Sequence, residues 1–256
     1  MTEERAESRD SQRVFRRFQT GVEFTPWTTW GVLAVLLAMH VLTGLWDVGH
    51  NRASWLGFFI GEHSKATLVT WGARTRWAVQ RGQAWRLLGY GLLHANWLHL
   101  GMNGLALLGL GRITESVFGG RRLLLLLLTT TLAGGVLSWW GGGTLSVGIS
   151  GGVFGLMGAL VAYGLWYRAA LPAALRELFG RRLAPWVALN LALGIPLAGV
   201  VDNYAHVGGL ISGLILGPTL ADHILDNRRP SASMDRVVLA VDVGLLLWVV
   251  VGLIVR

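Results

Sequence analysis

Long apolar runs are the feature that most constrains this chain. Several stretches approach the roughly 20 uncharged residues that a helix needs to cross a bilayer, and the first covers residues 30–46. Only 14% of the residues are charged, against roughly a quarter in soluble domains. Runs such as 123–128 do not alternate as barrel strands would. Because only helices and closed barrels satisfy the backbone in lipid, the sequence predicts an all-α polytopic membrane protein.

The apolar segments divide the chain into seven predicted spans. Residues 1–26 are polar and arginine-rich and are predicted to form a cytoplasmic tail. Residues 27–223 contain six spans, and 224–256 contain a linker and a seventh. Between the first two spans, Asp47–Tyr90 is predicted to form a structured loop on or partly in the membrane surface. The spans are Trp30–Trp46, Gly91–Gly111, Leu123–Trp140, Gly148–Trp166, Ala184–Gly199, Tyr204–Leu220 and Val237–Val255.

Lysine and arginine are unevenly distributed between the two sides of this arrangement. The tail and the loops after the second, fourth and sixth spans hold roughly twice as many as the opposite side. Cytoplasmic loops carry this excess, so the N-terminus is predicted to be cytoplasmic and the C-terminus outside. We expect a multi-pass protein of the bacterial inner (plasma) membrane.

Composition also limits the chemistry. The chain has no cysteine, which excludes disulfides, thiolate catalysis and zinc–thiolate sites. No basic stripe interleaved with aromatic residues stands clear of the predicted spans, so nucleic acid is not an expected partner. We expect no cofactor.

One serine stands among glycines where the fourth predicted span begins, in the stretch 148–155. Glycines let another helix or a substrate backbone approach the Ser150 hydroxyl. A serine attacks a carbonyl when a base takes its proton and donors stabilise the oxyanion. The predicted orientation puts His206, His99 and Asn103 near the same outer ends of their spans. Polar groups inside a membrane are costly, so this convergence indicates a functional site.

Helical spacing sharpens this prediction. His99 and Asn103 are four residues apart and share a helical face, whereas His94 would be turned away by about 140° and is expected to brace the long loop. Small residues recur every fourth position in the fourth and sixth spans, which predicts close packing and brings Ser150 within reach of His206. The stripes are Gly151, Gly155 and Ala159, and Gly209, Gly213 and Gly217.

The same residues admit other interpretations. The G-x-S-x-G match at Ser150 lacks the strand that an esterase elbow needs. A metal site built from His94, His99 and His206 is disfavoured, because no carboxylate or cysteine completes it. Asp202 lies one turn before His206 and is a possible third member of the site, although an aspartate facing water is the favoured account. His40, inside the first span, is expected to be a packing or hydrogen-bonded residue and not a ligand.

These motifs resemble those of the rhomboid family of intramembrane serine proteases over most of the chain. The family patterns H-x4-H-x3-N, G-x-S-G-x-x-x-G and A-H-x-x-G-x-x-x-G occur in the second, fourth and sixth spans. Trp85-Arg86 looks like the family's Trp-Arg pair, and Glu115 looks like its buried acid. The motif residues are His94, His99 and Asn103; Gly148, Ser150, Gly151 and Gly155; and Ala205, His206, Gly209 and Gly213.

The resemblance implies a six-helix rhomboid-like core to which the seventh helix is an addition. It implies a Ser150–His206 dyad without an obligatory aspartate. His99, Asn103 and the Ser150 backbone N–H would form the oxyanion hole, and Phe154 would offer a ring against which His206 rests.

The function that follows is an endopeptidase that cleaves single-span or otherwise membrane-anchored proteins near the outer face of the bilayer. The alternative is a catalytically silent rhomboid-like binder of membrane helices. A transporter would need discontinuous helices and charged residues along a path through the bilayer, and is disfavoured. The short fifth span is expected to swing aside to admit substrate. Replacing Trp186, Leu189 or Leu193 by smaller residues is expected to loosen this span.

Overall fold

The computed structural model of the protein describes residues 25–142, 145–169, 171, 173–197, 201–220 and 232–255. Most of the predicted tail and of the linker before the seventh span therefore lie outside the described residues. The division at residues 26 and 223 stays a prediction.

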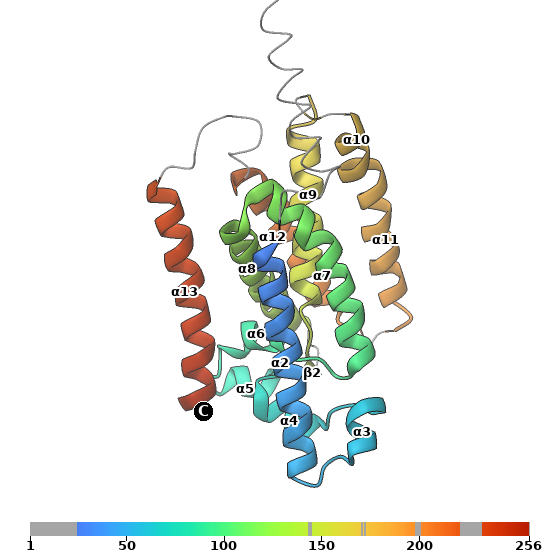
Figure 1. The fold of residues 1–256 in the computed structure, drawn as a ribbon, viewed down its shortest axis with the longest axis vertical. Helices are drawn as coiled ribbons and strands as arrows, with labels where there is room; N and C mark the ends of the chain where they lie inside the picture. The colour runs from blue at the N-terminus through green and yellow to red at the C-terminus, as the bar shows by residue number, and fades with distance from the viewer. Residues whose placement is uncertain are drawn as a thin grey trace, which may run out of the picture.

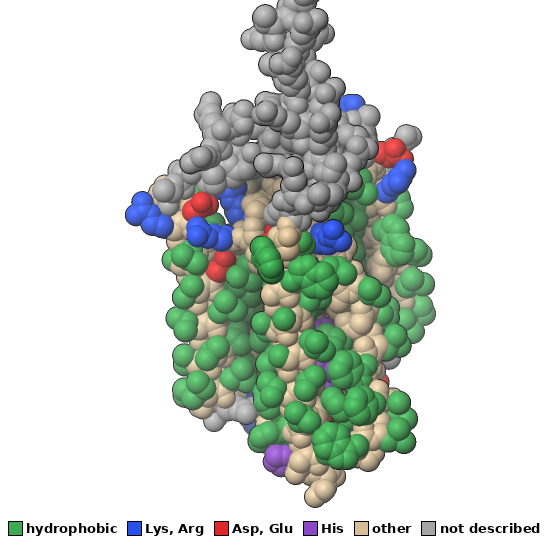
Figure 2. Space-filling model, in the orientation of Figure 1, with side chains coloured by type: hydrophobic (Ala, Val, Ile, Leu, Met, Phe, Trp, Pro, Cys, Tyr) green, Lys and Arg blue, Asp and Glu red, His purple; other side chains and the backbone are tan. Residues whose placement is uncertain are grey.

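The described chain is mostly helical, and its long helices run side by side (Figure 1). By length and composition, α2, α8 and α13 are able to cross a membrane, and α9 is a shorter apolar helix. Apolar side chains cover the middle of the bundle, and charged ones gather at its upper rim (Figure 2). The arrangement of seven spans stays a prediction. The long helices are α2 (Trp27–Gly49), α7 (Trp97–Phe118), α8 (Gly120–Trp140), α9 (Ser150–Trp166), α11 (Leu183–Gly194), α12 (Asn203–Leu220) and α13 (Ala232–Val255).

Helices α9 and α12 lie in close backbone contact. A Cβ atom added at Gly213 would collide with the carbonyl oxygen of Gly155, and one at Gly209 would collide with that of Gly151. Side chains at these positions would push the two helices apart. The predicted small-residue stripes are thus the surfaces on which these helices pack, and this contact joins the beginnings of both helices.

Each predicted span differs from its helix by a few residues at one or both ends. Helix α7 begins at Trp97, because the Asn96 side chain caps it by accepting the His99 N–H at 2.8 Å. The preceding residues form the short 3₁₀ helix η1 (Tyr90–Leu92), so the predicted start at Gly91 was wrong. Helix α11 ends at Gly194, short of the predicted Gly199, although 198–200 lie outside the described residues.

The segment between α2 and α7 is structured, as predicted, and lies at one end of the bundle (Figure 1). A two-residue strand, β1, pairs antiparallel with β2, which leads toward Ser150. Helix α3 exposes Trp55 and Phe59; placement of this surface in the membrane stays a prediction. The elements are α3 (Trp55–Ile60), α4 (Lys65–Trp71), β1 (Arg74–Thr75), α5 (Arg76–Gln80), α6 (Arg86–Gly89) and β2 (Leu145–Ser146). On the opposite side of the core, α10 (Ala173–Arg176) and the π-helical turn η2 (Glu177–Arg182) connect α9 to α11.

A buried aspartate joins this segment to α2. The Asp47 carboxylate accepts hydrogen bonds from the Ser64 N–H and hydroxyl and from the Thr67 hydroxyl, at 2.6–3.0 Å. His63 Nδ1 lies 3.5 Å from the same carboxylate, and its Nε2 lies 3.1 Å from His40 Nδ1. His40 is fully buried and is a packing residue, as expected.

Glu115, Trp85 and Arg86 have structural partners. The Glu115 carboxylate accepts the backbone N–H groups of Thr28 and Thr29 at 2.9 and 2.8 Å, which caps the start of α2. Arg86 donates to the carbonyls of Val69 and Ala73 at 2.6 and 3.0 Å and thereby shapes the turn before β1.

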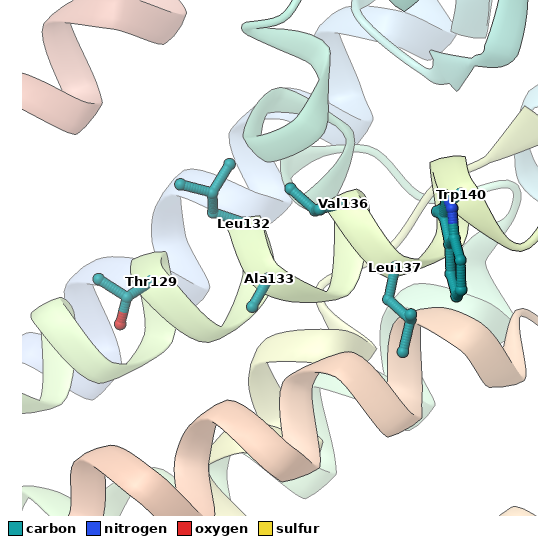
Figure 3. A pocket seen from close by; sticks show the side chains of 6 residues that line it. All are labelled: Thr129, Leu132, Ala133, Val136, Leu137 and Trp140. Carbon is teal, nitrogen blue, oxygen red and sulfur yellow. The ribbon is translucent and has the colours of Figure 1, made fainter.

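Helix α13 packs on α8 and against Trp85 through Gly252. It carries one buried acid that the sequence interpretation overlooked, Asp242, which is 2% exposed. An open apolar groove runs along α8 (Figure 3). The groove is lined by Thr129, Leu132, Ala133, Val136, Leu137 and Trp140.

Candidate active site

Ser150 is the first residue of α9, and its hydroxyl faces His206 on α12. The Ser150 Oγ and His206 Nε2 atoms are 2.9 Å apart. Gly148, just before the helix, has φ = +115°, a backbone conformation that favours glycine. The backbone N–H groups of the first turn of a helix have no intrahelical acceptor and favour negative charge. The serine thus lies where an oxyanion would be stabilised.

The imidazole of His206 is held by stacking. The ring lies parallel to that of Phe154, with centroids 4.2 Å apart and 12° between the planes. Nδ1 is buried and has no hydrogen-bond partner in the part of the chain that the structure describes. For Nε2 to accept the Ser150 proton, Nδ1 must carry the ring hydrogen. This pair has the separation that a nucleophile and its base require.

Among the described residues, no hydrogen bond joins Asp202 to the His206 ring, and Asp202 is not the aspartate facing water that the sequence favoured. Its Oδ1 accepts the Ala205 N–H at 3.1 Å, which caps α12. Its Oδ2 accepts hydrogen bonds from the Ser138 hydroxyl and from Arg74. Both of these partners were missed, because they are 64 and 128 residues away in the sequence and no local pattern links them.

His99 and Asn103 converge beside the glycine that precedes the serine. A Cβ atom placed on Gly148 would lie 2.8 Å from His99 Nε2 and 3.7 Å from Asn103 Nδ2. The Ala95 N–H donates a long hydrogen bond of 3.5 Å to His99 Nδ1. That bond leaves the ring hydrogen on Nε2, the nitrogen nearer to Gly148. Two side-chain N–H donors therefore lie beside Gly148, two residues before Ser150.

His94 does not occupy the place expected for it. It precedes α7, so the helical angle of about 140° does not apply. Its ring is fully buried and meets His99 edge to face, with ring centroids 5.1 Å apart. Neither ring nitrogen has a hydrogen-bond partner among the described residues. It therefore packs against a candidate oxyanion donor. Across the residues that the structure describes, no group of three or more His, Asp or Glu side chains is arranged to hold a metal ion.

Comparisons with known proteins agree on one family. The family model described as "Rhomboid domain" matches residues 81–223. The chain is 34% identical over 160 residues to "Rhomboid protease GluP" of Bacillus subtilis, which covers 62% of this chain and 31% of that protein. It is 39% identical over 165 residues to "RHOMBOID-like protein 6, mitochondrial" of Arabidopsis thaliana, which covers 62% and 51%.

A third relative is matched over more of its length. "RHOMBOID-like protein 2" of Arabidopsis thaliana is 36% identical over 220 residues, covering 75% of this chain and 67% of that protein. The chain spans about a third of the Bacillus protein and about half of the mitochondrial one. The family model nevertheless covers more than half of the chain. The chain is therefore a multi-pass membrane protein that belongs to the rhomboid family.

Proposed function

We propose that this protein is an intramembrane serine endopeptidase, with Ser150 as nucleophile and His206 as general base. One observation carries the proposal: the Ser150 Oγ–His206 Nε2 distance of 2.9 Å between two residues 56 positions apart. The stacked Phe154 ring and the donors beside Gly148 complete a site for acyl transfer. The name of the Bacillus relative, a rhomboid protease, supports the same activity.

The geometry supports a two-step mechanism. His206 Nε2 takes the proton of Ser150 Oγ as the oxygen attacks the scissile carbonyl carbon. The oxyanion that forms accepts hydrogen bonds from His99 Nε2, Asn103 Nδ2 and the Ser150 N–H. The protonated imidazole then gives its proton to the leaving amine, which leaves an acyl-serine. A water molecule, deprotonated by the same nitrogen, attacks that ester, releases a carboxylate and restores the hydroxyl.

Substrates and topology follow from the membrane setting. We propose that the substrates are single-span or membrane-anchored proteins, cleaved near the outer face. The bias of arginine between the loops supports a cytoplasmic N-terminus, seven spans and an external C-terminus. The expectation of a bacterial plasma membrane stays a prediction.

The alternative is a rhomboid-like protein that binds membrane helices without cleaving them. Such a protein has no need of a hydrogen-bonded serine and histidine. A reactive pair, a stacked ring and two adjacent donors all favour catalysis over binding alone.

Cleavage of a model substrate by the detergent-solubilised protein tests the proposal. We expect wild type to cleave a single-span substrate, and Ser150→Ala, His206→Ala and the double variant to be inactive to about the same degree. His50→Ala, which alters an exposed histidine, is the matched control and should cleave like wild type. Equal cleavage by wild type and Ser150→Ala would contradict the proposal, and so would a double variant far slower than both single variants.

A further inference from the structure

One arginine outside the candidate site lies against the approaches to both reactive residues. The backbone of Arg74, in β1, pairs with Ser146 in β2, four residues before Ser150. The side chain of Arg74 reaches Asp202, four residues before His206, at 3.3 Å. Nucleophile and base belong to helices that begin at these two points. A single residue therefore contacts the segments that lead into both.

The side-chain contacts form a closed triangle. Arg74 Nη2 donates to Ser138 Oγ and to Asp202 Oδ2, and the Ser138 hydroxyl donates to the same carboxylate oxygen. Ser138 lies in the last turn of α8. The three residues thus join the β1–β2 ribbon, α8 and the start of α12.

Asp202, held by Arg74 and Ser138, in turn restrains the backbone of His206. Its Oδ1 caps α12 at the Ala205 N–H, and its own carbonyl accepts the His206 N–H at 3.2 Å. Within the described residues His206 Nδ1 has no hydrogen-bond partner, so no carboxylate among them is hydrogen-bonded to the ring. The distance from Nε2 to Ser150 is therefore governed by the first turn of α12 together with the Phe154 stack.

The burial of Arg74 argues that this arrangement has a role beyond packing. The side chain is 0% exposed. Burial lowers the pKa of the guanidinium, and the Asp202 carboxylate opposes that shift. Removing one partner of a buried charge pair leaves the other charge uncompensated. Both hydrogen bonds are donated by Nη2, and an apolar residue in this place would make neither.

We propose that Arg74, Ser138 and Asp202 form a positioning clamp that sets the distance between Ser150 and His206. The purpose of the clamp rests on the proposed function, but its effect on the Ser150–His206 pair is measurable without proteolysis. All three are positioning residues, because none touches the reacting atoms.

A thiol reporter tests the clamp independently of protease activity. In this cysteine-free chain, Ser150→Cys creates a unique thiol whose thiolate is stabilised by a nearby imidazolium. We measure its alkylation by iodoacetamide from pH 5.5 to 9. The parent Ser150→Cys protein should react roughly tenfold faster near pH 6.5 than the same protein with His206→Ala.

Clamp variants are then compared in the Ser150→Cys background. Arg74→Met and Asp202→Asn should both bring alkylation near pH 6.5 down toward the His206→Ala level. Asparagine keeps the helix cap and loses the charge pair, so this variant preserves the test if Arg74→Met fails to fold. Arg76→Met, at an exposed arginine two residues away, should match the parent.

Two results would overturn the clamp. One is an unchanged pH profile in Arg74→Met or Asp202→Asn proteins that are folded. The other is a parent profile identical to that of His206→Ala, because there would then be no pair to position. If wild type cleaves no substrate while the thiol readout responds as expected, the protease proposal fails and the clamp stands.

Discussion

The ring of Phe154 lies parallel to the imidazole of His206, 4.2 Å from it between centroids. Phe154 follows Ser150 by one turn of α9. The helix that carries Ser150 therefore also carries the ring against which the His206 imidazole rests. A small rotation of α9 would move both together.

Replacing this ring should slow catalysis without abolishing it. Phe154→Leu removes the stacking and keeps most of the apolar volume. A stacked aromatic pair is worth about 0.5–1.5 kcal/mol, so we expect kcat to fall roughly two- to tenfold, while Phe154→Tyr keeps near-normal turnover. Initial cleavage rates measure this, with Phe59→Leu at an exposed phenylalanine as control. Equal rates for Phe154→Leu and wild type would refute a role for the stack.

The two donors beside Gly148 should matter in the transition state more than in substrate binding. His99→Ala or Asn103→Ala should lower kcat by roughly 10- to 1000-fold, the range for one oxyanion donor, with KM little changed. Met102→Ala, on the same helix and 65% exposed, should change neither kcat nor KM. A change confined to KM would assign these residues to substrate binding instead.

The sequence was sufficient to predict the helical bundle and the pairing of Ser150 with His206, for identifiable reasons. Apolar run lengths locate helices in lipid, and small residues at every fourth position mark where backbones touch. The predicted start of α7 was wrong because hydropathy carries no information about helix capping, although Asn96 before Trp97 is a cap signal. The environment of Asp202 was wrong because its partners come from distant parts of the chain.

Close backbone contact between α9 and α12 gives a prediction about stability. Gly213→Ala places a methyl group against the Gly155 carbonyl, and overpacking of this kind costs about 1–3 kcal/mol. Gly101→Ala is the matched control, because a Cβ there meets no described atom within 4 Å. Thermal unfolding in detergent should show a lower Tm for Gly213→Ala and an equal or higher Tm for Gly101→Ala. Equal Tm values for Gly213→Ala and wild type would contradict the close contact.

The buried His63 makes stability depend on pH. Burial lowers the pKa of His63, and the neighbouring Asp47 carboxylate only partly opposes that shift. His40 and Thr43 face its other ring nitrogen. The unfolded chain, with a histidine pKa of about 6.5, therefore takes up the proton first as pH falls.

This difference in proton affinity fixes the sign of the effect. The contribution of His63 is fully present above about pH 6.5 and is lost as pH falls through the folded-state pKa. We expect Tm to drop between pH 8 and pH 5.5, and to drop less in His63→Gln. His50→Gln, at an exposed histidine, should behave like wild type. A Tm that rises on acidification would contradict a lowered pKa of His63 in the folded protein.

Helix α11 packs on the core more weakly than its neighbours, and the structure corrects which of its residues hold it there. Trp186, Leu189 and Leu193 are 50–61% exposed, so the sequence-based expectation that trimming them loosens the helix is wrong. Val187 is buried in the main core, and Leu191 packs against that core. The Leu191 carbonyl also accepts the Asn203 side-chain N–H at 3.2 Å, which joins α11 to the start of α12.

If α11 swings aside to admit substrate, weakening these inward contacts should raise activity. Val187→Ala and Leu191→Ala remove apolar contact in the closed state only. A shift of about 1 kcal/mol toward a rarely populated open state raises that population roughly fivefold. Initial cleavage rates of a membrane-embedded substrate should rise by about that factor in either variant. Leu189→Ala makes the same chemical change on the exposed side of the helix and should leave the rate unaltered. Slower cleavage in both inward variants, at unchanged Tm, would show that α11 must stay in place and that substrate enters by another path.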